Sequence, residues 1–375
     1  MAPEIAIRRI EQLDDNDVLL DPMCGSGTVL RAAVEHGVTA LGVDIDPMAV
    51  LMAKVWCAPP SRSQLAHDAH EIIRRASESN AVDPVDLPWV DQETADFMSF
   101  WFAPDQRAHL SRLADVLSRS ELHSTDALRV ALSRIIVTKD GGASLGRDIS
   151  HSRPHKVSEL SDFDVPAEYM RSVRRLSERL NAERVRAAVE VQLGDSRRLP
   201  TSIEDGAVSC IVTSPPYLNA IDYLRGHRLS LVWLGYSVAE VRAIRADSIG
   251  AERGLEQADV DPYPYLTGSG TDEPATRIVG WSRRYLRDAY AASSEMARVL
   301  RPGGTATLVV GNSNIRGFRV DNAQMYADAL SRASMRIDTF DEREIPTRSR
   351  YLPTGGNSAL SLRMRVETVI SASKA

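Results

Sequence analysis

The sequence predicts an α/β fold in which a mostly parallel sheet is covered by helices. Two short apolar runs, at residues 18–20 and 40–45, flank a glycine-rich loop and a helix-like stretch. Strand, glycine loop, helix and strand in this order are typical of the start of a doubly wound sheet. The same alternation resumes at residues 188–195 and 207–217, where a buried strand runs into a Pro-Pro turn.

Composition narrows the class of protein further. The chain has 375 residues, of which 43% are hydrophobic and 26% charged, as in an ordinary globular protein with a sizeable core. It contains no apolar run of membrane-spanning length, its N-terminus lacks a signal-peptide pattern, and its three cysteines are too scattered for a disulfide scaffold or a zinc site. We therefore expect a cytoplasmic protein without a metal site. Because the net charge is -6, a nucleic acid would have to be bound by a local basic face.

Helical periodicity interrupts the α/β pattern and suggests two insertions. Residues 57–187 space their apolar positions by three and four, and residues 218–275 form a second, irregular insertion. We expect a catalytic domain formed by residues 1–56 and 188–375, with 57–187 as a helical insertion for target recognition and 218–275 as an insertion within the catalytic domain. A long helix is predicted to end at the Arg-Pro-Gly-Gly turn of residues 301–304.

The glycine-rich loop has the sequence Asp21-Pro22-Met23-Cys24-Gly25-Ser26-Gly27-Thr28. Glycines between a strand and a helix let the backbone approach a ligand closely, and the helix that follows presents free N–H groups. Asp44 ends the next strand, at about the spacing that lets a carboxylate bind ribose hydroxyls. The alternative role for Asp44 is a helix cap near Pro47, but Asp46 fits that role better. This spacing alone leaves open a nicotinamide dinucleotide or another adenosine ligand.

A second motif, Ser214-Pro215-Pro216-Tyr217, follows a buried strand. Together with the loop from Asp21 to Thr28, it resembles the S-adenosylmethionine-dependent amino-methyltransferases that modify N4 of cytosine or N6 of adenine in DNA. The resemblance extends to Asp44, to Gly194-Asp195 and to the turn at 301–304.

This resemblance implies a class I methyltransferase (Rossmann-like) fold with a seven-stranded sheet and S-adenosylmethionine as cofactor. The implied cofactor-binding residues are Asp21, Pro22, Cys24, Gly25, Gly27, Thr28, Asp44 and Asp195. The implied catalytic residues are Ser214, Pro215, Pro216 and Tyr217.

The chemistry of exocyclic amines explains why their methylation would use a Ser-Pro-Pro-Tyr motif. An exocyclic amine is a poor nucleophile because its lone pair is delocalised into the ring. The Ser214 side chain and the Pro215 carbonyl can accept its two N–H groups and expose the lone pair, while the prolines fix the backbone. Tyr217 can stack on a base flipped out of the duplex. Cys210 lies inside the strand rather than beside a proline, so we expect a core cysteine and no nucleophilic-cysteine chemistry.

Nucleic-acid contacts are expected in the insertions and in one late connection. The loop between the predicted helices supplies phosphate-directed donors, Arg225 follows the catalytic turn, and a connection at 345–358 supplies two arginines. A solvated surface is the alternative for each. The candidates are Arg147, His151, Arg153, His155, Lys156, Arg225, Arg348 and Arg350.

Among possible reactions, we favour N4-cytosine methylation of double-stranded DNA, because Ser at the first catalytic position is commoner among N4-cytosine enzymes of the family. N6-adenine in DNA and the N2 amine of guanine in RNA are the alternative substrates, and a catalytically idle binding protein is the alternative class. The family's helix before the cofactor loop is only partly matched by residues 3–13. An upstream segment or a partner subunit is one way to complete it, and a cognate restriction nuclease is a possible partner.

Overall fold

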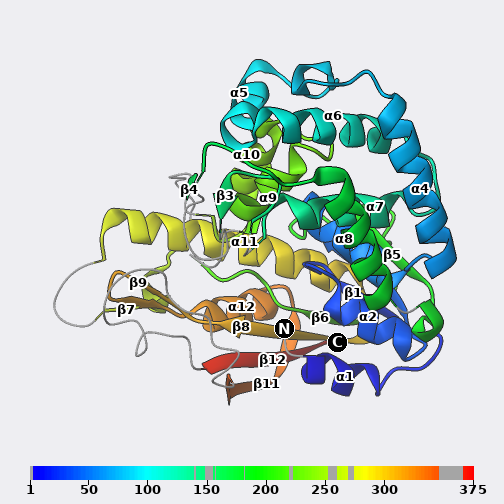
Figure 1. Ribbon diagram of the computed structural model, residues 1–375. Coiled ribbons are helices and arrows are strands. Elements are labelled where there is room, and N and C mark those ends of the chain that lie inside the picture. The colour runs from blue at the N-terminus through cyan, green and yellow to red at the C-terminus, as the bar shows by residue number, and fades with distance from the viewer. Residues whose placement is uncertain are drawn as a thin grey trace. The chain divides into compact units, whose positions relative to one another are not determined.

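The computed structural model describes residues 3–138, 141–147, 155–156, 158–180, 182–218, 223–251, 260–268, 274–345 and 366–375 (Figure 1). The chain forms two compact units. The sheet unit comprises Met1–Ile45, Arg186–Ile221 and Ala246–Ala375, and the helical unit comprises Asp46–Val185 and Asp222–Arg245.

The unit boundaries differ from the predicted domains at three places, of which the smallest moves residues 186 and 187 from the predicted insertion into the sheet unit. The prediction kept all of 218–275 in the catalytic domain, whereas residues 222–245 belong to the helical unit because Val232 and Trp233 are buried in its core. The prediction also assigned residues up to 56 to the catalytic domain. The structure places 46–56 in the helical unit, where Met48 and Val55 join the same core.

A seven-stranded sheet in the order β11-β12-β8-β6-β1-β2-β5 organises the sheet unit. The strands from β8 to β5 pair in parallel, whereas β12 is antiparallel to both β8 and β11. The sheet is therefore mostly parallel, as predicted. Its strands are β1 (Val18–Asp21), β2 (Thr39–Asp44), β5 (Val189–Leu193), β6 (Val208–Thr213), β8 (Leu300–Gly311), β11 (Met335–Glu344) and β12 (Val366–Lys374).

Helices of the sheet unit pack on these strands. In the long helix α11, Tyr285 and Met296 are buried in one core with Ile211 of β6 and Leu308 of β8. A smaller sheet in the order β7-β10-β9 belongs to the same unit. The remaining elements are α1 (Pro3–Ile10), α2 (Thr28–Glu35), η3 (Tyr263–Tyr265), β7 (Leu266–Gly268), α11 (Thr276–Val299), β9 (Ser313–Ile315), β10 (Phe318–Val320) and α12 (Asn322–Arg332).

The predicted Arg-Pro-Gly-Gly turn at 301–304 is part of a strand. β8 already begins at Leu300, opposite Val208, and its register against β6 shifts before Thr305 pairs with Cys210. Gly303 has a φ of +74°, which favours glycine. The four residues therefore form an irregularity within β8 rather than a separate turn.

Eight helices and a two-stranded sheet are described in the helical unit. Its core contains Trp233, which meets Phe102 edge to face with ring centroids 5.1 Å apart. Trp89 donates its indole N–H to the carbonyl of Val232 at 3.0 Å, which fastens the segment 222–245 to this core. The elements are α3 (Pro47–Cys57), α4 (Arg62–Glu78), η1 (Pro84–Asp86), α5 (Gln92–Trp101), α6 (Pro104–Ser118), α7 (Thr125–Ile136), β3 (Gly146–Arg147), β4 (His155–Lys156), α8 (Val165–Arg179), η2 (Ala182–Arg184), α9 (Tyr223–Leu231) and α10 (Val238–Asp247). Across the described residues of both units, no helix combines the length and apolar character needed to cross a membrane.

Candidate active site

The loop between β1 and α2 has a backbone that favours glycine. Gly25 and Gly27 have φ angles of +51° and +85°, in the left-handed region. No described atom lies within 4 Å of the position that a Cβ on Gly25 would occupy, so the space beside this backbone is open. α2 begins at Thr28, directly after the loop, and its first turn has N–H groups without partners inside the helix.

Backbone and side-chain hydrogen bonds fasten this loop to the end of β2. The N–H of Cys24 donates to the carbonyl of Val43 at 3.0 Å, and the N–H of Gly25 donates to Oδ2 of Asp44 at 2.7 Å. The N–H of Gly194 donates to the Asp44 carbonyl at 2.9 Å. The carboxyl ends of β1, β2 and β5 therefore meet around Asp44.

Asp46 caps a helix, as its position before Pro47 predicted. Its carboxylate accepts the N–H of Met48 at 2.9 Å at the start of α3. Its second oxygen lies 2.5 Å from Nδ1 of His227. Asp44 and Asp46, two residues apart, thus have different surroundings.

Asp21 links the two sequence motifs. Oδ1 of this buried residue accepts the Thr213 hydroxyl at 2.7 Å and the N–H of Met23 at 3.2 Å. Thr213 is the last residue of β6 and directly precedes Ser214. Burial raises the pKa of Asp21 from 3.8 to about 7, and the charge of Asp44 acts in the same direction, whereas the two hydrogen bonds oppose the rise. The glycine loop and the Ser-Pro-Pro-Tyr turn therefore leave the sheet side by side.

Neighbouring elements hold the Ser-Pro-Pro-Tyr turn. The Ser214 hydroxyl donates to the carbonyl of Val309 in β8 at 2.9 Å, which leaves its oxygen lone pairs able to accept a donor. The Pro216 carbonyl accepts the hydroxyl of the buried Tyr285 at 2.9 Å. No hydrogen bond to the Pro215 carbonyl occurs among the described residues. Tyr217 is half-buried against the sheet core.

Asp195, just after β5, is held by Arg197. Its Oδ1 accepts the Arg197 backbone N–H at 2.9 Å, and its Oδ2 accepts Nη2 at 2.6 Å. Arg197 also pairs with Asp247 at 3.1 Å and with the buried Asp288 at 3.2 Å. Burial raises the pKa of Asp288, whereas the charge of Arg197 lowers it. Asp195, one of the predicted cofactor-binding residues, is therefore oriented by an arginine that is itself anchored in the sheet unit.

Fewer of the nucleic-acid candidates can be placed. His151, Arg153, Arg348 and Arg350 lie outside the described residues. Only the backbones of Arg147 and His155 are described, where they pair in the two-stranded sheet of β3 and β4. The two remaining candidates are Lys156, whose Nζ lies 2.6 Å from Glu159 and 5.4 Å from the Phe100 ring centroid, and Arg225, which is partly buried on α9.

Several residues at this site were not singled out from the sequence. Thr213 carried one usable signal, because it directly precedes the catalytic motif. Tyr285 gave no signal in the sequence, because its partner Pro216 is distant along the chain. Arg197 gave none either, because its partner Asp195 lies in what appears to be an ordinary turn. Gly250 has a φ of +81°, and a Cβ there would lie 2.8 Å from the Tyr217 carbonyl oxygen. A side chain at this position would therefore press on the Ser-Pro-Pro-Tyr turn.

The fold and the arrangement of the two motifs define the class of protein. Seven strands in this order, with one reversed strand next to the edge, form the class I methyltransferase (Rossmann-like) fold. The glycine loop, Asp44 and Asp195 lie at the carboxyl ends of adjacent parallel strands, where ligands bind in open α/β sheets.

Sequence comparisons agree with this class, although no family model matches the chain. The chain is 22% identical over 386 residues to the type II methyltransferase M.MvaI of Kocuria varians, an alignment that covers 94% of this chain and 83% of that protein. It is 22% identical to M.AvaI of Nostoc sp. and 23% identical to M.BsoBI of Geobacillus stearothermophilus, both type II methyltransferases. Each of these alignments covers 62% of this chain and about half of the relative, at 51% and 50%.

Similarity to solved structures is weak. An S-adenosylmethionine-dependent methyltransferase from Methanosarcina mazei has a TM-score of 0.34 and 13% identity, over 100% of this chain and 98% of that one. The geranyl diphosphate C-methyltransferase of Streptomyces coelicolor A3(2) has a TM-score of 0.36 and 9% identity, over 100% and 79% of the two chains. At TM-scores this low, the fold class rests on the strand order of the chain itself.

Proposed function

We propose that this protein transfers a methyl group from S-adenosylmethionine to the exocyclic amine of a base in double-stranded DNA, with N4 of cytosine as the favoured target. The observation that carries the proposal is the hydrogen bond of 2.7 Å between Thr213 and Asp21, which brings the glycine loop and the Ser-Pro-Pro-Tyr turn together. Similarity to type II methyltransferases, a name used for DNA methyltransferases of restriction–modification systems, supports DNA as the substrate. Ser214 at the first position of the motif favours cytosine by family resemblance.

The residues of the glycine loop fit the proposed cofactor. Open space beside Gly25, with Asp44 next to it, suits a ligand that lies against the backbone. Asp44 would bind the ribose hydroxyls, and Asp195, held by Arg197, would accept the adenine amine. Bound there, S-adenosylmethionine supplies an electrophilic methyl group.

The chain's own residues would activate and orient the amine. The Ser214 hydroxyl already donates to Val309, so its oxygen can accept one amine N–H, and the Pro215 carbonyl can accept the other. Both acceptors are fixed before the reaction, Ser214 by its bond to β8 and the turn by Tyr285, so that little reorganisation is needed. Tyr217 would stack on the flipped base. Methyl transfer would form the nitrogen–methyl bond as the sulfur–methyl bond breaks with its electrons staying on sulfur, and one amine proton would pass to water.

Sequencing of modified bases tests this proposal. The protein is expressed in a host that lacks DNA methylation, and the genome is read by a method that separates N4-methylcytosine from N6-methyladenine. We expect N4-methylcytosine within a recurrent sequence, and we expect Ser214→Ala to reduce it by about 10²–10³-fold, the cost of losing one fixed polar contact to the reacting group. N6-methyladenine would overturn the choice of base. Methylated RNA with unmodified DNA would overturn the choice of nucleic acid.

A further inference from the structure

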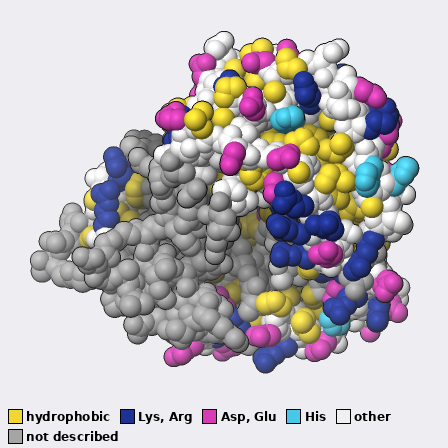
Figure 2. Space-filling model, in the orientation of Figure 1, with side chains coloured by type: hydrophobic (Ala, Val, Ile, Leu, Met, Phe, Trp, Pro, Cys, Tyr) yellow, Lys and Arg dark blue, Asp and Glu magenta, His cyan; other side chains and the backbone are white. Residues whose placement is uncertain are grey.

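The helical unit carries an arginine cluster that the sequence did not single out. It consists of Arg134 in α7 and Arg174, Arg175 and Arg179 in α8, all of them exposed. Figure 2 shows Lys and Arg side chains gathered where Figure 1 draws α8. Together α7 and α8 contain six arginines against three carboxylates, although the whole chain has a net charge of -6.

Packing between α7 and α8 brings the cluster together. The Tyr169 hydroxyl donates to the Leu128 carbonyl at 3.4 Å, and the Ser172 hydroxyl donates to the Ala131 carbonyl at 2.8 Å. Both contacts advance three residues along each helix, so the helices run in the same direction and Arg134 lies level with Arg175. The buried face of α8, with Val165, Tyr169, Ser172, Val173 and Leu176, points its arginines away from the core.

No carboxylate neutralises the cluster among the described residues. Arg134, Arg174, Arg175 and Arg179 form no ion pair with a described residue, whereas Arg171 pairs with Glu168 at 2.8 Å. Partial desolvation and the charges of Arg179 and Arg175 lower the pKa of Arg134, as expected when cations approach without a counter-charge. The stripe of Arg171, Arg175 and Arg179 at four-residue spacing also destabilises the isolated helix, because like charges at this spacing repel one another.

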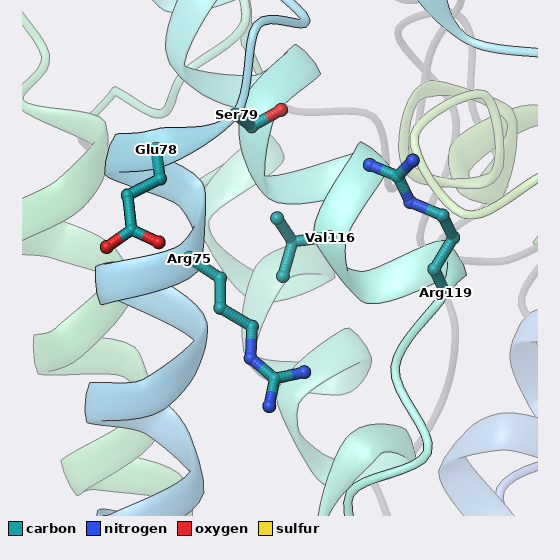
Figure 3. Close-up of a pocket in the computed structure, with 5 residues that line it drawn as sticks. All are labelled: Arg75, Glu78, Ser79, Val116 and Arg119. Atoms are coloured by element: carbon teal, nitrogen blue, oxygen red, sulfur yellow. The ribbon is translucent and has the colours of Figure 1, made fainter.

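Several other exposed arginines of the helical unit, in α4 and α6, are paired with carboxylates. Arg74 and Arg75 of α4 lie 2.8 Å and 2.7 Å from Glu71, and Arg119 pairs with Asp115. Arg75 and Arg119 line a shallow hollow of about 270 Å³ together with Glu78, Ser79 and Val116 (Figure 3). Since these arginines already have partners within the protein, the hollow gives no reason to expect a bound anion. The four arginines of the cluster have no such partners, so an anion is expected there.

The helix dipole offers a simpler explanation for two of the four arginines. Arg134 and Arg179 lie in the last turns of α7 and α8, where the helix dipole stabilises a positive charge. Arg174 and Arg175 lie before that turn and gain less. The helix dipole therefore does not explain why Arg174 and Arg175 add positive charge to the same face.

Continuity with the predicted DNA-contact loop points to the occupant. The loop that carries Arg147 and Lys156 connects α7 to α8. It begins folded onto the last turn of α7, where the N–H groups of Ala143 and Ser144 donate to the carbonyls of Ile135 and Ile136 at 2.8 and 3.0 Å. Arg134 lies in that same turn.

We propose that Arg134, Arg174, Arg175 and Arg179 form a contact surface for the phosphate backbone of DNA. This proposal rests on the proposed function, because it takes DNA as the substrate. Guanidinium groups bind phosphate oxygens in pairs of hydrogen bonds and carry no base specificity when they do so. The cluster would therefore strengthen binding to any DNA sequence and leave the choice of base to the catalytic turn.

The test compares two triple variants that remove the same charge. The first carries Arg134→Gln, Arg175→Gln and Arg179→Gln. The control carries Arg74→Gln, Arg75→Gln and Arg119→Gln, which removes three arginines that already have carboxylate partners. DNA binding is measured by fluorescence anisotropy between 50 and 300 mM salt, and the unfolding free energy of each variant is measured in urea.

We expect the cluster variant to bind DNA about tenfold or more weakly and its slope of log affinity against log salt to fall by about 3, since each lost phosphate contact removes ~0.9. The control should keep most of the slope. Equal slopes for cluster variant and wild type, or equal losses in both variants, would overturn the proposal. A loss of stability without a loss of DNA binding would assign the arginines to the helix dipole instead.

Wild-type activity separates this proposal from the function on which it rests. If the wild type methylates DNA and the cluster variant keeps the wild-type salt slope, the contact surface is wrong and the function stands. If the wild type neither binds nor methylates DNA, both fail. Salt-dependent binding of RNA alone through these arginines would refute DNA as the occupant.

Discussion

Replacement of Asp21 by Asn removes a buried negative charge and keeps the hydrogen bonds that hold the two motifs together. The Thr213 hydroxyl and the Met23 N–H both donate to Oδ1, which asparagine retains. In the wild type, burial raises the pKa of Asp21 from 3.8 to about 7. The difference corresponds to about 4 kcal/mol between the charged and the neutral form.

The direction of the pH effect follows from linkage. Below pH 3.8, Asp21 is protonated in the folded and in the unfolded chain. As the pH rises towards 7, the unfolded chain loses the proton while the folded chain keeps it, so the stability contributed by the neutral group is progressively lost. Above pH 7 the full cost of about 4 kcal/mol applies. Asp21→Asn has no charge to bury, so its stability relative to the wild type should increase as the pH rises.

Urea unfolding of both proteins at pH 5, 6, 7 and 8 measures this difference. We expect the variant to be more stable than the wild type at pH 8, by a margin that shrinks towards pH 5. Asp91→Asn is the control, because Asp91 is an exposed helix cap whose pKa is lowered by hydrogen bonds to Thr94. Its stability difference from the wild type should stay constant above pH 5. If the unfolding free energies of Asp21→Asn and the wild type changed in parallel with pH, the raised pKa of Asp21 would be refuted.

Three further variants test individual roles at the candidate site. Asp44→Ala should weaken S-adenosylmethionine binding by about 1–3 kcal/mol in titration calorimetry, because it leaves ribose hydroxyls unpaired and frees the Gly25 N–H; unchanged binding would move the ribose contact to Asp46. Tyr217→Ala should lower turnover far more than cofactor affinity, and equal losses of both would remove its stacking role. Arg197→Gln should lower the unfolding free energy by about 3–5 kcal/mol at pH 8 and by less at pH 5, because the buried Asp288 then takes up a proton; a loss that is independent of pH would contradict this ion pair.

Local chemistry made much of the sheet unit predictable. Glycine at positive φ, the acidic residue that ends β2 and the proline pair after β6 are all visible within short stretches of sequence. Asp46 was predicted as a helix cap because capping depends only on its immediate neighbours. The sheet was therefore predicted from local patterns, before any long-range contact was known.

Long-range packing accounts for what the sequence did not reveal. The link from Tyr285 to Pro216 joins residues far apart in the chain, and no local pattern marks it. The Arg-Pro-Gly-Gly segment appeared to be a turn because glycine and proline usually end elements. It stays within β8 because the residues on either side, Leu300 and Thr305, both pair with β6. The assignment of residues 222–245 to the helical unit likewise depends on where Trp233 is buried.

The helical unit is encoded by two stretches of the chain, 46–185 and 222–245, separated by β5, β6 and the catalytic turn. A single recombination event cannot exchange this unit between related proteins, because it would separate Trp89 from the Val232 carbonyl that accepts its indole N–H. An engineered chimera would need four matched junctions, at 45/46, 185/186, 221/222 and 245/246. The unit would then change more readily by point substitution on its surface than by exchange of the whole unit.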